Sequence, residues 1–407
     1  MKCRFCATLL HDLFLDLGTA PPSNAFLTTA DLNAPELYFP LRLFTCKACY
    51  LVQVDEVQKH DTLFSRDYVY FSSYSRTWLA HAESYVEMVT RRLGLNPSSM
   101  VMEIASNDGY LLQFVEARGI PCVGIEPTSG TAQVAREKGI ETIERFFGRA
   151  FATEFVCDRL PADLIVANNV LAHVPDLNDF VAGLALALAP EGTITVEFPH
   201  LMELVANRQF DTVYHEHFSY FSLHTVRAVF GAHGLRLWDV ERLPTHGGSL
   251  RLWVTHQDSR HKETPAVAAL LASEAAAGMR DPAYYHGFQA QADVIKNGLL
   301  EFLLAQHHAG RKVAGYGAAA KGNTLLNYAG VKPDLLPYVV DASPHKLGRY
   351  LPGSRIAVVA ESRLRTDRPD FVLILPWNLK QEITEQLAYI RDWGGQFVTA
   401  VPRLEIQ

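Results

Sequence analysis

Hydrophobic residues concentrate in two long stretches of the chain, where short apolar runs alternate with amphipathic segments. The first stretch spans residues 101–198 and the second spans residues 313–401. The short apolar runs are typical of strands buried on both faces, and the segments between them carry apolar residues at helical spacing. This alternation predicts two α/β units, each built on a doubly wound parallel sheet.

In the first stretch the pattern predicts parallel strands and helices, followed by one more helix and a closing antiparallel strand pair. The predicted strands are Val101–Ile104, Cys122–Ile125, Leu164–Ala167, Thr193–Phe198, Leu235–Leu243 and Ser249–His256. The predicted helices are Gly109–Arg118, Gly130–Lys138, Leu177–Leu188 and a helix that Ser222 caps and that runs to about Gly231.

The second stretch repeats the alternation, and helical segments precede both stretches. Its predicted strands are Val313–Tyr316, Tyr338–Asp341, Phe371–Leu375 and Phe397–Val401, with helices that run through Tyr328 and from about Gln381. Residues 266–307 form an Ala- and Leu-rich helical connector, and residues 76–93 carry apolar residues at helical spacing. We therefore expect three domains, at residues 1–60, 61–260 and 261–407.

Composition narrows the classes of protein to which the chain can belong. Its 407 residues are 48% hydrophobic and 20% charged, as in soluble globular proteins of more than one domain. The formal net charge is −7 and the basic residues are dispersed, which gives no footprint for nucleic acid. The longest apolar run, Val181–Ala189, is too short to span a bilayer, and the N-terminus lacks a signal peptide's apolar segment. We expect a cytoplasmic protein, monomeric or weakly oligomeric, without nucleic-acid or membrane partners.

Four of the six cysteines form two CxxC pairs near the N-terminus. The pairs are Cys3 with Cys6 and Cys46 with Cys49. Two such pairs complete a tetrahedral Zn–S4 shell, whereas a thioredoxin-like redox function would need a single CxxC at a strand–helix junction. The shell closes if the strand-like run Leu37–Thr45 returns beside the N-terminus. We expect one structural zinc ion here, and we expect Cys122 and Cys157 to be buried thiols.

The first α/β unit carries polar residues where its strands end, and these suggest a nucleotide-like cofactor. The first strand leads into a turn of small residues from Glu103 to Gly109, the second strand ends at Glu126, and the strand Leu164–Ala167 ends at Asn168 and Asn169. An acid after the second strand accepts ribose hydroxyls in NAD sites as well as in S-adenosylmethionine (SAM) sites. The turn has one glycine, which suits SAM better than a dinucleotide pyrophosphate. The three features together favour SAM, with Glu103, Asn107, Gly109, Glu126, Asn168 and Asn169 as candidate cofactor-binding residues.

Four consecutive residues just after this unit can all move or polarise protons. They are Tyr214, His215, Glu216 and His217. Methylation of oxygen or nitrogen needs at most a modest base, whereas a C–H bond must be deprotonated before its carbon can attack a methyl group. A cluster of proton-transfer groups beside a methyl donor therefore suggests methylation of carbon.

The second α/β unit opens with a glycine-rich turn directly after a strand. Gly315, Gly317 and Ala320 fit the pattern G-x-G-x-x-A, and Asp341 ends the next strand. Read alone, the turn predicts NAD, although a helix N-terminus with Lys321 nearby fits any phosphate and a purely structural turn is a third interpretation.

In its full length the chain resembles the sugar C-methyltransferase family. It is most similar to the TDP-4-keto-deoxysugar 3-C-methyltransferases of the tetronitrose-pathway type. The resemblance rests on the order of several motifs: the paired CxxC module, the segment from Tyr70 to Ser75, the turn at residues 103–109, Tyr-x-Glu-His, Pro-x-His-Gly-Gly and Gly-Tyr-Gly-Ala-x-Ala-Lys.

The resemblance implies a fold and a set of roles. It implies a small zinc module, a class I SAM-methyltransferase domain and a second Rossmann-like domain that anchors the nucleotide diphosphate of a sugar substrate. His217 would remove the C3 proton of a 4-keto-deoxysugar, with Tyr214 and Glu216 supporting it, and Tyr70 and Ser73 would close over the SAM carboxylate. The remaining implied substrate-binding residues are His246, Gly247, Gly315, Tyr316, Gly317, Lys321, Asp341 and Trp377.

Several functions stay open on the sequence alone. They are O- or N-methylation of a related sugar nucleotide, an NAD-dependent sugar oxidoreductase that uses the glycine-rich turn, and a non-catalytic scaffold. The sequence also leaves open whether His215 or His217 is the base.

Overall fold

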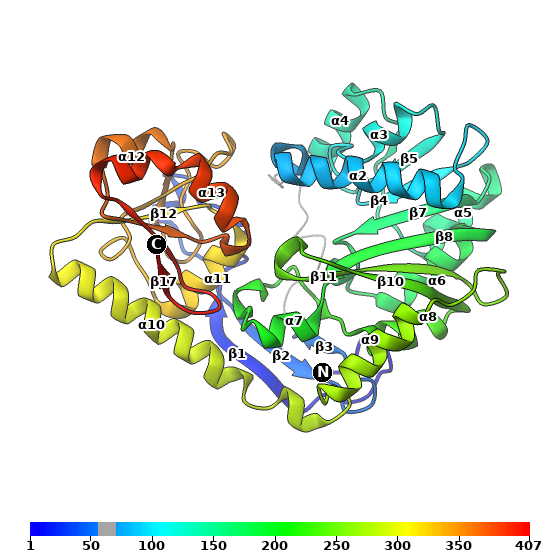
Figure 1. Ribbon diagram of the computed structural model, residues 1–407, viewed down its shortest axis with the longest axis horizontal. Coiled ribbons are helices and arrows are strands. Elements are labelled where there is room, and N and C mark those ends of the chain that lie inside the picture. The colour runs from blue at the N-terminus through cyan, green and yellow to red at the C-terminus, as the bar shows by residue number, and fades with distance from the viewer. Residues whose placement is uncertain (56–70) are drawn as a thin grey trace.

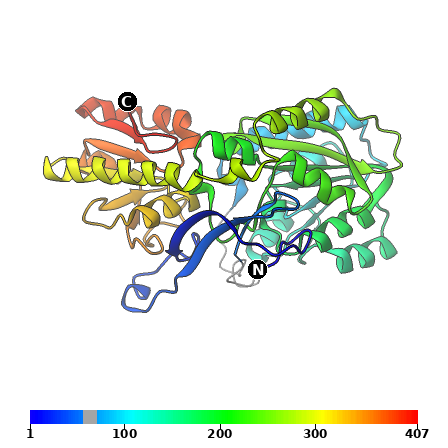
Figure 2. The same ribbon diagram turned by 90° about the horizontal axis from the view of Figure 1, so that it is seen from below.

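The computed structural model describes residues 1–55 and 71–407, which form three β-sheets (Figure 1). Two α/β units lie side by side, and a long ribbon of N-terminal strands runs beneath both. Figure 2, seen from below, shows these strands crossing in front of the region where the two units meet.

The larger unit is a seven-stranded sheet in the order β10-β11-β8-β7-β4-β5-β6, with β11 antiparallel to both of its neighbours. Its strands are β4 (Val101–Ile104), β5 (Cys122–Ile125), β6 (Thr142–Ile143), β7 (Ala162–Asn168), β8 (Leu188–Pro199), β10 (Leu235–Leu243) and β11 (Ser249–His256). Its helices are α2 (Arg76–Leu93), α3 (Leu112–Glu116), α4 (Ser129–Glu137), α5 (Arg149–Asp158), α6 (Leu177–Ala187), α7 (Leu201–Ala206) and α8 (Leu223–Gly231). The parallel strands with an antiparallel closing pair are confirmed, and β6 is a seventh strand that the sequence pattern did not locate.

The second unit is a six-stranded sheet in the order β14-β13-β12-β15-β16-β17, parallel except for β17. Its strands are β12 (Val313–Tyr316), β13 (Tyr338–Val340), β14 (Ala357–Val359), β15 (Phe371–Ile374), β16 (Gln396–Thr399) and β17 (Glu405–Ile406). Its helices are α11 (Ala320–Ala329), α12 (Ser362–Asp367) and α13 (Lys380–Gln386). The carboxyl end of the central strand β12 leads through Gly317 into α11, as in nucleotide-binding α/β folds.

The N-terminal sheet joins strands that are far apart in the sequence. It pairs β1 (Asp12–Ala20), β2 (Phe39–Thr45) and β3 (Val52–Val54) with β9 (Ser219–Tyr220), which directly follows His217 and Phe218. Because β9 belongs to the same short segment as the Tyr-His-Glu-His run, the N-terminal module is hydrogen-bonded to that segment.

One hydrophobic core extends from the N-terminal strands through the connector to the second sheet. Phe14 on β1 stacks on Phe288 of helix α10 (Phe288–His308) at a centroid distance of 4.9 Å. The same buried cluster contains Leu326 of α11 and Leu373 of β15. Each fully buried side chain of this size contributes roughly 1.5–3 kcal/mol, so this core fixes the second unit against the N-terminal strands.

The sequence pattern located the main elements, and the structure differs from it in several details. Helix α2 has its predicted bounds, with Ser75 as its N-cap, and Ser222 caps α8 as predicted. Helix α3 is shorter than the predicted Gly109–Arg118, and the 266–307 connector is interrupted between α9 (Pro265–Ala276) and α10. Helices α5, α7 and α12 and strands β6, β14 and β17 were not predicted.

Two further features bear on the sequence predictions. The prediction of buried thiols is wrong for Cys157, which is exposed, and Cys122 is half-buried. Among the described residues, no helix has both the length and the apolar content needed to cross a membrane.

Candidate functional site at the domain interface

The four N-terminal cysteines meet in one cluster, as the sequence predicted. All four Sγ atoms lie within 4.8 Å of one another, with Cys3–Cys49 at 3.6 Å, Cys6–Cys46 at 3.5 Å and Cys6–Cys49 at 3.7 Å. A tetrahedral zinc ion with Zn–S bonds of about 2.3 Å separates its sulfurs by about 3.8 Å. The residues present therefore fit a Zn–S4 site closed to substrate.

The backbone around both cysteine pairs follows the same course. Ala7 and Tyr50, each directly after the second cysteine of a pair, have left-handed φ angles of 59°, and their N–H groups donate to the carbonyls of Cys3 and Cys46. Gln53 donates its amide to Cys3 Sγ at 3.3 Å, and hydrogen bonding from Cys49 is the main cause that lowers the pKa of Cys3. Two matching turns and an amide directed at a sulfur are features expected around zinc thiolates.

The predicted cofactor turn places three carboxyl groups together at the carboxyl ends of β4 and β5. Glu103, Asp108 and Glu126 are all buried, with exposed fractions of 1–3%. Burial, with Asp108 and Glu126 nearby, holds the pKa of Glu103 well above its usual range, and burial also raises the pKa of Glu126. A ligand with positive charge would relieve this crowding, and SAM carries a sulfonium and an ammonium group. These three carboxyl groups therefore fit SAM.

Glu126 is held at the end of β5 by the turn itself. Its carboxylate accepts hydrogen bonds from the N–H groups of Asn107 and Thr128, both at 2.9 Å. Asn107 has a left-handed φ of 51°, and Gly109 has a φ of 73° at a place where a Cβ would clash with Ile140. Strained backbone of this kind is common at ligand sites, where the chain approaches the ligand closely.

A short helix after the undescribed segment caps this turn. In η2 (Ser72–Tyr74), the N–H of Ser72 donates to Asn107 Oδ1 at 2.9 Å, and the N–H of Ser73 donates to Asp108 Oδ2 at 3.3 Å. Lys138 donates to Ser73 Oγ at 2.9 Å. Ser73 thus lies at the predicted cofactor turn, while Tyr70 lies outside the described residues.

The end of β7 connects the cofactor turn to the β10–β11 loop. The amide of Asn168 hydrogen-bonds the hydroxyl of Tyr110, which also hydrogen-bonds Glu103. The side-chain amide of Asn169 lies 3.2 Å from His246 Nε2. Asn169 and His246 both have left-handed φ angles of 54°, and burial lowers the pKa of His246 to about 4.

His217 has a defined tautomer in the segment after η4 (Phe210–Thr212). Its Nδ1 donates to the carbonyl of Thr212 at 3.0 Å, so its Nε2 carries the lone pair and accepts from the Tyr214 hydroxyl at 2.7 Å. Burial, with His173 and Lys321 nearby, lowers the pKa of His217 well below its usual range. The imidazole is therefore neutral near pH 7, and Nε2 is chemically able to accept a proton.

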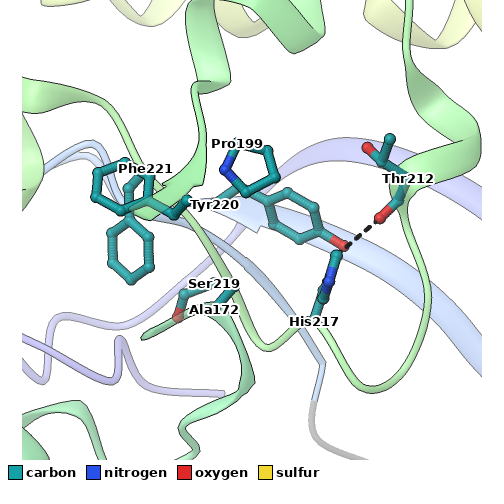
Figure 3. Close-up of a pocket in the computed structure, with 8 residues that line it drawn as sticks. Ala172, Pro199, Thr212, His217, Ser219, Tyr220 and Phe221 are labelled. Atoms are coloured by element: carbon teal, nitrogen blue, oxygen red, sulfur yellow. Dashed lines mark hydrogen bonds between the residues drawn. The ribbon is translucent and has the colours of Figure 1, made fainter. Parts of the chain in front are cut away.

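His217 borders a small cavity with room for about one water molecule. Figure 3 shows His217 and Tyr220 reaching one side of the cavity, close to Thr212. His173 packs edge-on against His217 at a centroid distance of 4.6 Å, and burial lowers the pKa of His173 to about 4. The lining residues are Ala172, Phe198, Pro199, Thr212, His217, Ser219, Tyr220 and Phe221.

The other two members of the predicted cluster are directed at the N-terminal module. His215 Nε2 donates to the carbonyl of Pro40 at 3.2 Å. Both carboxylate oxygens of Glu216 accept from the Asn24 amide, at 2.9 and 2.7 Å, and burial raises the pKa of Glu216 to about 7. The structure thus brings Tyr214 to His217, and it directs His215 and Glu216 toward other partners.

The glycine-rich turn of the second sheet is built as its sequence suggests. Gly315 and Tyr316 end β12, Gly317 has a φ of 90°, and the N–H of Ala318 donates to Asp341 Oδ2 at 2.7 Å. Lys346 donates to the carbonyl of Ala318 at 2.8 Å. The turn, Asp341 and a cation therefore lie together at the N-terminal end of α11.

Lys321 and Trp377 meet the first unit at the domain interface. Lys321 Nζ donates to Asn378 Oδ1 at 3.0 Å and lies 4.7 Å from the centroid of the Trp377 ring. Trp377, in η7 (Trp377–Leu379), donates Nε1 to Asp211 Oδ2 at 2.7 Å, and a Cβ on Gly247 would clash with its ring. Both units thus contribute side chains to one constellation with His246 and His217.

Sequence reasoning missed several residues of this constellation. Asp211, His173, Asn24 and Trp78 were not singled out, although Trp78 lies 5.4 Å from the His246 ring and 5.9 Å from the Tyr110 ring. Asp211 lies three residues before Tyr214, and this proximity in sequence is the one local signal that could have identified it. The others reach the site through contacts between distant segments.

Comparison with protein families matches three consecutive parts of the chain. A model of a zinc binding domain matches residues 3–64, a methyltransferase domain matches residues 78–240, and a C-methyltransferase C-terminal domain matches residues 244–402. The third match begins before β11, a strand that completes the seven-stranded sheet.

Individual proteins give a consistent picture. The chain is 34% identical over 404 residues to the C-methyltransferase NovU of Streptomyces niveus, covering 98% of this chain and 95% of that protein. A ubiquinone biosynthesis O-methyltransferase of Idiomarina loihiensis is 29% identical over 96 residues, 23% of this chain and 40% of that protein. The solved magnesium protoporphyrin IX methyltransferase of Synechocystis with bound SAM aligns at a TM-score of 0.37 and 14% identity, over 50% of this chain and 99% of its own. The chain therefore belongs to the C-methyltransferase family and is a SAM-dependent methyltransferase with an N-terminal zinc-binding domain.

Proposed function

We propose that this enzyme methylates C3 of a nucleotide-linked 4-keto-deoxysugar. The observation that carries the proposal is the defined tautomer of His217, whose Nδ1 donates to Thr212 and leaves Nε2 with its lone pair. A ketone at C4 acidifies the hydrogen on C3, but a base is still required to remove it. A carbon-directed methyltransferase needs such a base, whereas methylation of oxygen or nitrogen needs a weaker one or none.

In this proposal His217 takes the C3 proton and the C–H electron pair becomes part of an enolate. The Tyr214 hydroxyl, 2.7 Å from His217 Nε2, is close enough to turn from the imidazole to a developing enolate oxygen. SAM would supply an electrophilic methyl group, and the carboxyl-rich turn at Glu103, Asp108 and Glu126 would hold this positively charged cofactor.

The second unit is proposed to hold the nucleotide diphosphate. The N-terminal end of α11, the turn at Gly315–Gly317 and Lys346 provide N–H groups and positive charge suited to phosphate. The sugar would then lie between the units, beside Trp377, His246 and Gly247. His215 and Glu216 are proposed to position the segment that carries His217, because both are bonded to the N-terminal module.

Incubation with SAM and a panel of thymidine- and uridine-diphospho-4-keto sugars tests the proposal. The expected product is heavier by about 14 mass units, with the new methyl group bonded to carbon. A methyl group found on oxygen or nitrogen by NMR would replace the proposal with methylation of a heteroatom. Absence of product with every 4-keto sugar in the panel, from enzyme that binds SAM, would remove this substrate class.

A further inference from the structure

Lys321 is placed where a lysine is electrostatically unfavourable. It is the second residue of α11, close to the positive end of the helix dipole, where anions and not cations are stabilised. Burial lowers the pKa of Lys321 to about 8, and the nearby carboxylate of Asp211 opposes the effect. Because both the helix dipole and burial disfavour a cation here, the lysine suggests a function.

Asp211, the acid that faces Lys321, has unused capacity for hydrogen bonding. It is fully buried, and its Oδ2 accepts from Trp377 Nε1. Its Oδ1 has no hydrogen-bond partner among residues 1–55 and 71–407. Burial raises the pKa of Asp211 to about 6, and the charge of Lys321 counteracts this. Asp211 is therefore a buried acid close to the half-buried Lys321, and a ligand could supply the hydrogen bond that its Oδ1 lacks.

The ammonium group of Lys321 is directed into the domain interface and not at the glycine-rich turn. It contacts Asn378 and the face of Trp377, whose ring packs on Gly247 of the first unit. Its positive charge is among the causes that lower the pKa values of His217 and His246. The turn itself has a different cation, because Lys346 contacts Ala318 and Asp341.

Base and electrophile must be close together in the proposed reaction. The proton that leaves is on C3 and the oxygen that gains charge is on C4, so the two atoms are separated by only three bonds. The group that balances the enolate must therefore face the same small space as His217 Nε2. Lys321 is on α11, the helix whose Thr324 donates to the carbonyl of Val213 at 2.7 Å, so it lies on the element that contacts the segment carrying His217.

We propose that the Lys321 ammonium, in contact with Trp377 and Asn378 and close to the carboxylate of Asp211, binds the C4 oxygen of the sugar and stabilises the enolate, and that it does not bind the diphosphate. The inference rests on the function proposed above. His217 Nε2 takes the C3 proton, the C–H electron pair forms the C3=C4 bond, and the carbonyl π pair moves to the oxygen beside Lys321. Tyr214 supplies a neutral hydrogen bond in this step, and Lys321 supplies charge.

Steady-state kinetics of Lys321→Met and Lys346→Met separate the two functions of a lysine. Loss of a preorganised group at a developing oxyanion lowers kcat by about 10²–10³-fold, which we expect for Lys321→Met with the inhibition constant of thymidine diphosphate within about threefold of wild type. Lys346→Met should instead weaken the binding of thymidine diphosphate about tenfold or more, with a smaller change in kcat. Lys332→Met, beyond the far end of α11, is the charge-matched control.

A C3-deuterated substrate gives a readout that a structural role would not change. If Lys321 assists deprotonation, Lys321→Met should raise the primary isotope effect on kcat, because proton removal becomes more rate-limiting. Lys321→Arg should keep part of the activity. If Lys321→Met no longer binds SAM, or if its circular-dichroism spectrum differs from that of wild type, Lys321→Gln provides the same comparison in a folded protein.

Two results would overturn the inference. One is a near-normal kcat for Lys321→Met with thymidine diphosphate binding weakened, which would assign Lys321 to the diphosphate. The other is a lower kcat with an unchanged isotope effect in both the Met and the Gln variants. Failure of the proposed function is a separate result, since the wild-type enzyme itself would then methylate no 4-keto sugar nucleotide in the panel.

Discussion

At the scale of single residues, the contact partners separate four adjacent proton-transfer groups into two pairs. Tyr214 and His217 hydrogen-bond each other at the interface between the α/β units. His215 and Glu216 bond to Pro40 and Asn24 of the N-terminal module. This pairing follows from a turn: the N–H of His217 donates to the carbonyl of Tyr214 at 3.0 Å, so the first and last of the four residues come together. Geometry thus favours His217 over His215 as the proposed base.

We predict that His217→Asn lowers kcat by about 10²–10⁴-fold, because general-base catalysis contributes about that much. SAM affinity should stay near that of wild type, since the cofactor turn lies on other elements. Turnover of a 4-keto sugar nucleotide and SAM titration measure the two quantities. His215→Asn is the matched control and should retain most of kcat; near-normal turnover by His217→Asn would transfer the role of base to His215.

Glu216 gives a prediction for pH dependence. Burial raises its pKa to about 7, above the unfolded value of about 4.5. The folded state therefore holds the proton more tightly, so this group's contribution to stability is fully present below about pH 4.5 and is lost as the pH rises through about 7. Glu216→Gln cannot ionise, and its stability relative to wild type should increase over that interval by up to about 3 kcal/mol.

Thermal or urea unfolding of both proteins at several pH values between 4.5 and 8 measures this difference. His173 and His246 act in the opposite direction, because their lowered pKa values remove stability as the pH falls below about 6.5. They are present in both proteins and cancel in the comparison. A stability difference that stays constant from pH 4.5 to 8 would contradict the raised pKa of Glu216.

At the scale of elements, sequence periodicity predicted most strands and helices because each is decided by local pattern. Ser75 and Ser222 cap helices where the sequence places them, and the two central strands β4 and β12 have their predicted bounds. The pairing of β3 with β9 could not be predicted. It joins residues 52–53 to residues 219–220, and two-residue strands carry no periodic signal.

The candidate site divides in the same way. The acids of the cofactor turn and the four cysteines follow from motifs with fixed spacing, so their proximity was predictable. The orientation of Lys321 was not predictable, since its motif suggested phosphate binding while its side chain contacts Asn378 and Trp377. Asn24 reaches Glu216 across 192 residues of sequence, and no local rule encodes that contact.

The link between the zinc cluster and β9 predicts an effect of zinc removal on activity. Arg4, between Cys3 and Cys6, donates to the carbonyl of Val54 at 2.8 Å and to that of Phe218 at 3.3 Å. Loss of the metal should release this turn and with it the segment that carries His217. We expect about one zinc per chain, and we expect chelation or Cys46→Ser to lower kcat although the closed Zn–S4 site cannot contact substrate.

Elemental analysis and turnover before and after chelation test this expectation, and zinc added back should restore activity. Cys157→Ser, at an exposed thiol on α5, is the control for loss of a cysteine. Full activity in protein shown to contain no zinc would mean that the metal does not support the catalytic segment.

At the scale of the whole molecule, three units meet around the segment at residues 213–217. The N-terminal module contributes Ser23 and Asn24, and α11 of the second unit contributes Asn323 and Thr324. Asn323 donates to the carbonyl of Ser23 at 2.6 Å, and Thr324 donates to that of Val213 at 2.7 Å. The segment that carries His217 is thus fixed from both sides, which is what precise placement of a base requires.

Asn24→Ala tests whether this junction supports catalysis. The substitution leaves the buried Glu216 carboxylate without the two hydrogen bonds from Asn24, and an unsatisfied buried polar group costs about 1–3 kcal/mol. We expect a lower unfolding midpoint and a lower kcat, with SAM affinity unchanged because the cofactor turn lies elsewhere. Asn33→Ala, at an exposed position of the same module, should change neither. If Asn24→Ala instead weakens SAM binding and leaves kcat intact, the module acts through the cofactor turn and the junction does not position His217.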